Sequence, residues 1–302
     1  MTVPFTLPGV AGSFIEKEPI HRGWSGDAKF RVMAGDGTPY LLRLSPAERL
    51  DVRRALHTQM QQAAALGIPM CRPVAFGQLP GGDVFSLQRW VDGEDLEAVL
   101  PGLPPARQYA LGLESGEALR LAHSIPAPDN QEPWGPRFSR KVDRNIKIYR
   151  TCGLRLAGDG HVLAYLAANR HLLEERPQCF QHGDFHAGNM MLEKGRVVLI
   201  DFDRFDFGDP WEDFSRIVWS AAASPHFATG QVVGYFGGPP PLDFWRLLTF
   251  YIASNTLSSL PWAVPFGAEE IDVMLRQAAD VLRWFDNFKS PVPSWYLADY
   301  PR

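Results

Sequence analysis

Two short segments near the N-terminus alternate hydrophobic and polar residues, as β-strands do. They cover 29–33 and 39–44 and are separated by the turn-forming residues of 34–38, so the pattern predicts a β-hairpin. One face of the second segment carries Tyr40, Leu42 and Leu44. Because successive side chains of a strand point to opposite faces, Arg43 is expected on the other face.

Helical and strand patterns continue from this hairpin to about residue 90. Ser45, Pro46 and Glu48 form a capping-box sequence with proline at the first helical position, which predicts a helix from there to about residue 67. An apolar run over 84–90 predicts a further strand before the polar residues of 92–95. Three strands and one helix predict a small α+β domain over residues 1–88.

Beyond residue 88 the spacing of apolar residues is mainly helical. The segments with this spacing are 105–124, 161–175, 243–260 and 268–288. An exception is 190–201, where two apolar runs flank Lys194-Gly195 and predict a hairpin. The sequence therefore divides into two expected domains, 1–88 and 89–302.

The composition argues against several classes of function. The net charge of −4, from 34 acidic and 30 basic residues, lacks the basic surplus of nucleic-acid-binding proteins, so no nucleic-acid partner is expected. No apolar run approaches the roughly 20 residues of a membrane helix, and the first residues do not follow the pattern of a signal peptide. The three cysteines form no metal-binding or disulfide pattern. We therefore expect a cytoplasmic protein without a membrane partner.

A group of polar residues suitable for metal-dependent chemistry stands around the predicted hairpin. Residues 182–189 read HGDFHAGN, and Asp201 follows Asn189 by twelve residues, at the end of an apolar strand. Because a hairpin reverses the chain, Asn189 and Asp201 are expected side by side, and their oxygens are ligands that Mg²⁺ prefers. Asp184 precedes Asn189 by one loop's length, which places a carboxylate where a hydroxyl would attack a γ-phosphate.

These residues resemble the signature of the aminoglycoside phosphotransferase and choline kinase-like family, which is similar to the catalytic loop of protein kinases. The resemblance implies a two-lobed protein-kinase-like α+β fold with a small β-rich N-terminal lobe and a larger, mainly helical C-terminal lobe. It implies that Asp184 is the catalytic base and that Asn189 and Asp201 bind Mg²⁺. The segment Gly208-Asp209-Pro210 with Asp213 matches the family's next motif.

The resemblance also implies a nucleotide site in the N-terminal domain. Segment 21–26 (HRGWSG) resembles the family's phosphate-covering loop, which assigns Gly23, Ser25 and Gly26 to nucleotide binding. The backbone of Gln88, Arg89 and Trp90 is the expected contact for adenine. Arg43 stands where the family has a phosphate-binding lysine, and the helix after it carries no acid from residue 53 to residue 67. An arginine can still hold phosphate oxygens in a bidentate contact.

Three features of this pattern admit two readings. His182 and His186 can bind metal or brace the loop, and bracing is the better interpretation. Asp203 can assist metal binding or cap the following turn. Segment 137–150 is rich in basic residues and can attract an anionic ligand or form an amphipathic helix with a solvated basic face, and the helix is the better interpretation. If it borders the acceptor site, it argues against polycationic aminoglycosides.

The sequence thus predicts an enzyme, an ATP- and Mg²⁺-dependent phosphotransferase that acts on a hydroxyl of a small molecule. Two alternatives stay open: a nucleotide-binding pseudoenzyme or regulatory module, suggested by Arg43, and a protein Ser/Thr kinase. The second is disfavoured because Asp201 is followed directly by GDPWEDF at 208–214, without the activation segment of protein kinases. The acceptor, the preference for ATP over GTP and the oligomeric state do not follow from the sequence.

Overall fold

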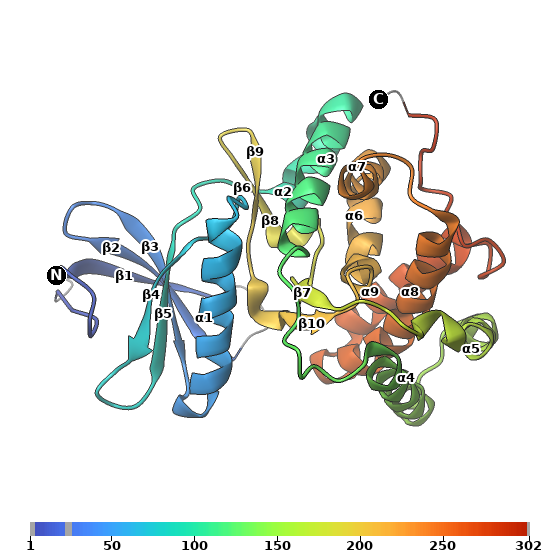
Figure 1. The fold of residues 1–302 in the computed structure, drawn as a ribbon, viewed down its shortest axis with the longest axis horizontal. Coiled ribbons are helices and arrows are strands. Elements are labelled where there is room, and N and C mark those ends of the chain that lie inside the picture. The colour runs from blue at the N-terminus through green and yellow to red at the C-terminus, as the bar shows by residue number, and fades with distance from the viewer. Residues whose placement is uncertain (1–3, 22–25, 301–302) are drawn as a thin grey trace. The chain divides into compact units, whose positions relative to one another are not determined.

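The computed structural model describes residues 4–21 and 26–300. Contacts within the chain divide it into two units. The first comprises Met1–Glu94 with Met191–Asp203, and the second comprises Asp95–Met190 with Arg204–Arg302. Figure 1 shows the strands of the first unit and the helices of the second.

The first unit contains a five-stranded antiparallel sheet in the order β1-β2-β3-β5-β4. Its strands are β1 (Phe14–Ile20), β2 (Ala28–Ala34), β3 (Pro39–Ser45), β4 (Pro73–Gln78) and β5 (Val84–Arg89). The predicted hairpin of β2 and β3 and the predicted strand β5 are confirmed. Strands β1 and β4 were not predicted, because β1 is largely exposed and β4 begins with proline and contains glycine.

The two faces of this sheet differ in chemistry, as the alternation in β3 predicts. One face carries the apolar cluster of Leu7, Phe14, Val32, Leu42, Phe85 and Leu87. Arg43 lies on the other face, where helix α1 (Leu50–Ala65) runs alongside the strands (Figure 1). The buried residues of α1 are Arg53, Leu56, Met60 and Ala63.

The predicted capping box at the start of this helix is wrong. A short 3₁₀ turn, η1 (Ala47–Arg49), precedes α1, and neither element has a side-chain cap. Ser45 is still the last residue of β3, so its hydroxyl is not at the helix start and instead accepts a hydrogen bond from Arg53 Nε at 3.0 Å.

A second hairpin belongs by its contacts to the first unit, although the predicted boundary placed it in 89–302. It consists of β8 (Met190–Glu193) and β9 (Arg196–Leu199), which form a small sheet with β6 (Glu94–Asp95) in the order β6-β8-β9. Lys194 and Gly195 have φ values of 52° and 74°, so the predicted two-residue turn is confirmed. Cys71 N–H donates to Leu199 O at 2.9 Å, which ties this hairpin to the N-terminal segment.

The second unit is mainly helical. Its helices are α2 (Leu96–Val99), α3 (Pro105–Ala122), α4 (Trp134–Thr151), α5 (Asp159–Ala168), α6 (Ile217–Ala223), α7 (Pro225–Phe236), α8 (Leu242–Ala263) and α9 (Ala268–Trp284). Besides η1, the 3₁₀ turns are η2 (Leu100–Gly102), η3 (Arg170–Leu173), η4 (Ala187–Asn189), η5 (Phe202–Arg204), η6 (Glu212–Arg216) and η7 (Val264–Phe266). Two short strands, β7 (Cys179–Gln181) and β10 (Asp206–Gly208), pair antiparallel. In the described part of the chain, no helix has the length and hydropathy to cross a bilayer.

The four helical segments predicted for this unit are found, with two changes. Segment 161–175 divides into α5 and η3, and segment 268–288 ends as a helix at Trp284. Helix α9 ends at this point because the backbone leaves the helical conformation: Asp286, Asn287 and Phe288 have φ values of 46°, 52° and 64°.

Helices α3 and α7 approach closely through glycines on both sides. A Cβ atom added to Gly116 would lie 2.1 Å from Gln231 O, and one added to Gly230 would lie 2.3 Å from Tyr109 O. Any side chain at these positions would force the two helices apart.

We therefore expect Gly116→Ala to lower the free energy of unfolding by about 1–3 kcal/mol, the usual cost of overpacking, even though alanine is the better helix former. Chemical denaturation measures this difference. Gly160→Ala in α5 is the control, because a Cβ there meets no atom within 4 Å, and its stability should be unchanged or slightly raised. Equal stability of the two variants would contradict the packing argument.

Candidate active site

The loop that carries Asp184 is held by hydrogen bonds to Asp213, which belongs to the motif of residues 208–213 noted in the sequence. The loop begins after β7 and ends in η4 (Ala187–Asn189). The fully buried Asp213 carboxylate accepts hydrogen bonds from the N–H groups of His182 and Gly183, each at 2.7 Å, and lies 3.1 Å from His123 Nε2. Gly183 has φ of 81°, a backbone conformation that favours glycine, and a Cβ atom added there would lie 1.9 Å from Arg204 O.

The two histidines of the loop brace it, as predicted. His182 Nδ1 accepts the N–H of Asp184 at 3.3 Å, and His186 Nδ1 accepts the N–H of Gly188 at 3.1 Å. Burial lowers the pKa of His186 to about 4, although Asp184 raises it, so this ring is neutral at neutral pH.

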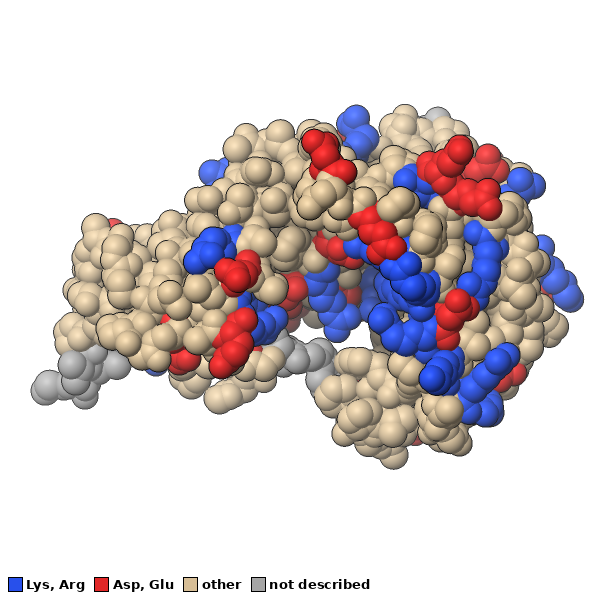
Figure 2. Space-filling view, turned by 60° about the horizontal axis from the view of Figure 1, so that its bottom comes forward, with Lys and Arg blue, Asp and Glu red and all other residues tan. Residues whose placement is uncertain are grey.

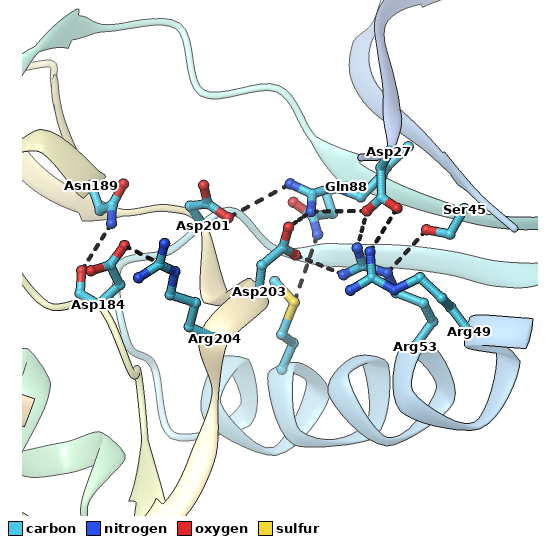
Figure 3. A network of polar contacts seen from close by, with 12 residues as sticks. Asp27, Ser45, Arg49, Arg53, Gln88, Asp184, Asn189, Asp201, Asp203 and Arg204 are labelled. Atoms are coloured by element: carbon cyan, nitrogen blue, oxygen red, sulfur yellow. Dashed lines mark hydrogen bonds and ion pairs between the residues drawn. The ribbon is translucent and has the colours of Figure 1, made fainter. Parts of the chain in front are cut away.

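The side-chain amide of Asn189 is oriented by the contacts of its nitrogen. This nitrogen donates to Asp184 O at 2.9 Å and lies 3.3 Å from His186 Nε2 (Figure 3). Its side-chain oxygen forms no hydrogen bond with a described residue. The amide therefore presents an oxygen, the kind of ligand that Mg²⁺ prefers.

The carboxylate of Asp184 lies between cations of its own unit. Arg216 Nε is 3.5 Å from one carboxylate oxygen and Arg204 Nε is 3.8 Å from the other, and Figure 3 shows Arg204 pointing toward it. Burial by itself would raise the pKa of Asp184, but the charges of Arg216 and Arg204 outweigh it and lower the pKa below its usual value. Asp184 is therefore ionised at neutral pH.

A cavity of about 160 Å³ opens beside these arginines, within the second unit. Its charged lining comprises Lys141, Arg204, Arg216, Asp206 and Glu212. Both carboxylates have partners, because Glu212 pairs with Lys141 at 3.0 Å and Asp206 pairs with Arg137 at 3.1 Å. Burial also raises the pKa of Glu212. The uncharged polar part of the lining comprises Asn145, Gln181, Ser215, Ser254, Asn255 and Ser258.

Asp201, in the first unit, has the properties of a metal ligand. It follows β9 by two residues and adopts φ of 61°, an uncommon conformation that often marks functional positions. Its Oδ1 atom is buried and forms no hydrogen bond with a described residue, and Arg43 Nη2 is 3.7 Å away. A buried carboxylate oxygen without a hydrogen bond fits a cation ligand. No cluster of three or more His, Cys, Asp or Glu suited to a metal ion occurs among the described residues.

Asp203 takes part in a network of arginines and aspartates in the same unit. It contacts Arg43 and lies 2.7 Å from Arg53 Nη1. Asp27, whose side chain is fully buried, contacts Arg53 and lies 3.0 Å from Arg49 Nη1 (Figure 3). The sequence left two roles open for Asp203, metal binding and capping of the following turn. The observed contacts are of a third kind, because the carboxylate forms ion pairs with arginines.

Arg43 is held by this network. Its side chain is only 6% exposed, and Asp27 Oδ2 lies 3.4 Å from its Nη1. Burial lowers the pKa of Arg43, which the charge of Asp201 partly offsets. The acid of helix α1, Asp51, pairs with Arg54 of the same helix at 2.9 Å and not with Arg43. The helix contributes a second arginine, Arg53, which shares the partners of Arg43.

Sequence reasoning missed Asp27 and Arg53. A signal for Arg53 was available, since it stands in the stripe of α1 that also buries Leu56, Met60 and Ala63. An arginine in a buried stripe requires a carboxylate partner. Nothing in the sequence pattern identified that partner as Asp27.

The residues predicted to bind nucleotide are placed only in part. Gly23 and Ser25 lie outside the described residues, whereas Gly26 is exposed just before β2. Gln88 and Arg89 end β5, and Trp90 follows them.

The N–H groups of this segment are used within the first unit. Those of Arg89 and Trp90 donate to Arg72 O at 2.8 Å and Pro39 O at 3.4 Å. That of Asp92 donates to Glu193 Oε1 at 2.8 Å, whereas Val91 N–H has no partner among the described residues.

Comparisons with known proteins agree on the type of fold. The family model described as the phosphotransferase enzyme family (APH) matches residues 17–245. No curated protein sequence matches the chain significantly. A thermostable mutant of aminoglycoside phosphotransferase APH(4)-Ia in its apo form has a TM-score of 0.65 and 15% identity, covering 90% of this chain and 95% of that chain.

Two further solved structures have the same fold at low identity. Amicoumacin kinase hAmiN in complex with AMP-PNP, Ca²⁺ and Ami has a TM-score of 0.62 and 13% identity, covering 91% of this chain and 90% of that chain. A choline/ethanolamine kinase family protein from Mesorhizobium loti has a TM-score of 0.61 and 19% identity, covering 94% of this chain and 92% of that chain. The predicted kinase-like α+β fold is confirmed. Because the family model spans well over half of the sequence, the chain belongs to the phosphotransferase enzyme family.

Proposed function

We propose that this protein transfers the γ-phosphate of ATP to a hydroxyl group of a small molecule. The observation that carries the proposal is the ionised carboxylate of Asp184, flanked by Arg204 and Arg216, which both line the cavity of the second unit. A carboxylate in this state accepts the proton of a hydroxyl bound beside it. Family membership supplies the reaction class.

Each remaining residue of the predicted site has a role in this proposal. Asn189 and Asp201 hold Mg²⁺, which would neutralise the charge that develops on the phosphates. The loop with Gly23, Ser25 and Gly26 covers the phosphates, and Arg43 contacts them from β3. The buried Asp201 oxygen and the oriented Asn189 amide support the metal assignment.

Adenine would be bound by the backbone of Gln88, Arg89 and Trp90. Because the N–H groups of Arg89 and Trp90 are already bonded, these residues would offer their carbonyl oxygens. The N–H of Val91 would be the donor for a ring nitrogen. The AMP-PNP complex of amicoumacin kinase supports nucleotide binding by this fold.

We further propose that the acceptor is small, polyhydroxylated and without positive charge. The cavity of about 160 Å³ is below the roughly 300–1,000 Å³ of pockets for drug-sized ligands. Its two carboxylates are paired, so a polycation would find no free partner there. Helix α4 contributes Lys141 and Asn145 to the lining. Figure 2 shows many basic side chains, with some acidic ones among them, on one face of the larger unit.

A panel of acceptors tests this function by the release of ADP from ATP and Mg²⁺. The panel contains neutral polyols and monosaccharides, sugar acids, choline and aminoglycosides, with the protein alone as background. We expect turnover above background with an uncharged or anionic polyhydroxylated compound only. If only aminoglycosides are phosphorylated, the proposed class of acceptor is wrong, whereas the proposed phosphotransferase activity stands. Nucleotide binding without turnover on any acceptor would favour a regulatory module.

A further inference from the structure

A lysine on the strand next to Arg43 has the position of a second cation for the nucleotide. Lys29 on β2 is the cross-strand partner of Arg43 on β3, and cross-strand partners project from the same face of a sheet. Lys29 is half-buried, and its ammonium forms no ion pair or hydrogen bond with a described residue. Arg43, in contrast, is surrounded by Asp203, Asp27 and Asp201.

The charges around Arg43 are balanced without Lys29. The arginines of the network are Arg43, Arg49 and Arg53, and the aspartates are Asp27, Asp201 and Asp203. Lys29 adds a fourth positive charge to three arginines and three aspartates, so one positive charge is in excess. A half-buried ammonium without a partner is costly, and a bound anion relieves that cost.

The electrostatic environment of Lys29 agrees with this geometry. Burial lowers the pKa of Lys29, the charge of Arg43 lowers it further, and the charge of Asp201 raises it. Lys29 is thus coupled to Asp201, the residue assigned above to Mg²⁺. A phosphate that contacts both the Lys29 ammonium and an Mg²⁺ ion on Asp201 would need Lys29 and Asp201 close to each other.

We propose that Lys29 contacts the phosphate oxygens of the nucleotide and contributes more to nucleotide affinity than Arg43 does. The proposal rests on the ATP-dependent function proposed above. The physical reason is that the charge of Arg43 is largely neutralised by carboxylates, so less of it is available to a phosphate. The lysine that the family carries at position 43 would thereby be replaced by a lysine from the neighbouring strand.

Calorimetric titration of the full chain with AMP-PNP and Mg²⁺ tests the proposal. Lys29→Met should weaken AMP-PNP binding about ten-fold or more, the scale of one charge-assisted contact, and Lys29→Arg should restore most of the affinity. Binding of adenosine, which lacks phosphates, should be unchanged in both variants. Lys17→Met is the matched control, because Lys17 is an exposed lysine on β1 whose ammonium lies over the Phe30 ring at 3.9 Å.

The other possible results of the titration contradict either the proposed function or the role of Lys29. If the wild-type protein does not bind AMP-PNP, the proposed function fails, and this inference fails with it. If the wild type binds and Lys29→Met binds equally well, only the assignment of Lys29 is wrong. If Lys29→Met weakens the binding of adenosine and of AMP-PNP to the same extent, Lys29 stabilises the sheet and does not contact phosphate. Thermal unfolding of each variant shows whether it is folded.

Discussion

Replacing Asp184 with Asn is expected to lower the rate of phosphate transfer by about 10²-fold or more, the usual scale for loss of a positioned general base. Asparagine keeps the shape of the side chain but cannot accept the proton of the acceptor hydroxyl. Arg204 and Arg216 would lose their carboxylate partner, but neither belongs to the unit that carries the proposed phosphate and adenine contacts. Nucleotide binding should therefore persist.

Turnover in the ADP-release assay and titration with AMP-PNP separate these two effects. Asp243→Asn is the matched control, since Asp243 on α8 is 77% exposed and pairs with Arg246 in its own helix. A loss of AMP-PNP affinity as large as the loss of turnover would show that Asp184 is not the base.

Replacing Asp201 should abolish magnesium-dependent turnover altogether. The carboxylate is a proposed ligand of Mg²⁺, and an amide oxygen without the negative charge binds this ion far less well. Asp201→Asn is the more informative substitution, because asparagine tolerates the φ of 61° at this position as well as aspartate does. Asp201→Ala would add a backbone cost of about 1–2 kcal/mol.

The experiment is a titration of turnover with Mg²⁺, accompanied by thermal unfolding. We expect Asp201→Asn to fall to the ATP background at every Mg²⁺ concentration while its unfolding temperature stays close to wild type. Asp36→Asn is the control, since Asp36 lies in the exposed β2–β3 turn and its carboxylate bonds to Thr38, two residues along the same turn. Unchanged turnover in Asp201→Asn would remove this residue from the mechanism.

Elements with strong local patterns were predicted from sequence. The hairpins β2–β3 and β8–β9 and helices α3, α4 and α8 follow from periodicity and turn residues, which depend only on neighbours along the chain. Strands β1 and β4 were missed because their pairing in the sheet, and not an apolar pattern of their own, makes them strands.

The motif of residues 182–201 was recognised for a different reason. The order of Asp184, Asn189 and Asp201 around a hairpin is a local motif, and its chemistry can be inferred from residue types and spacing. Asp213 was singled out only through the family resemblance, and the structure shows its carboxylate accepting the N–H groups of His182 and Gly183.

By itself, the sequence determined the family, the kinase-like fold and the acid–amide–acid motif, because these reside in periodicity and short-range order. Only the tertiary structure decided what surrounds Arg43. Its partners Asp27 and Asp203 and its neighbour Lys29 come from three separate segments of the chain. Ion pairs of this kind depend on which strands and helices face one another, and buried charges select their partners by distance in space and not along the chain.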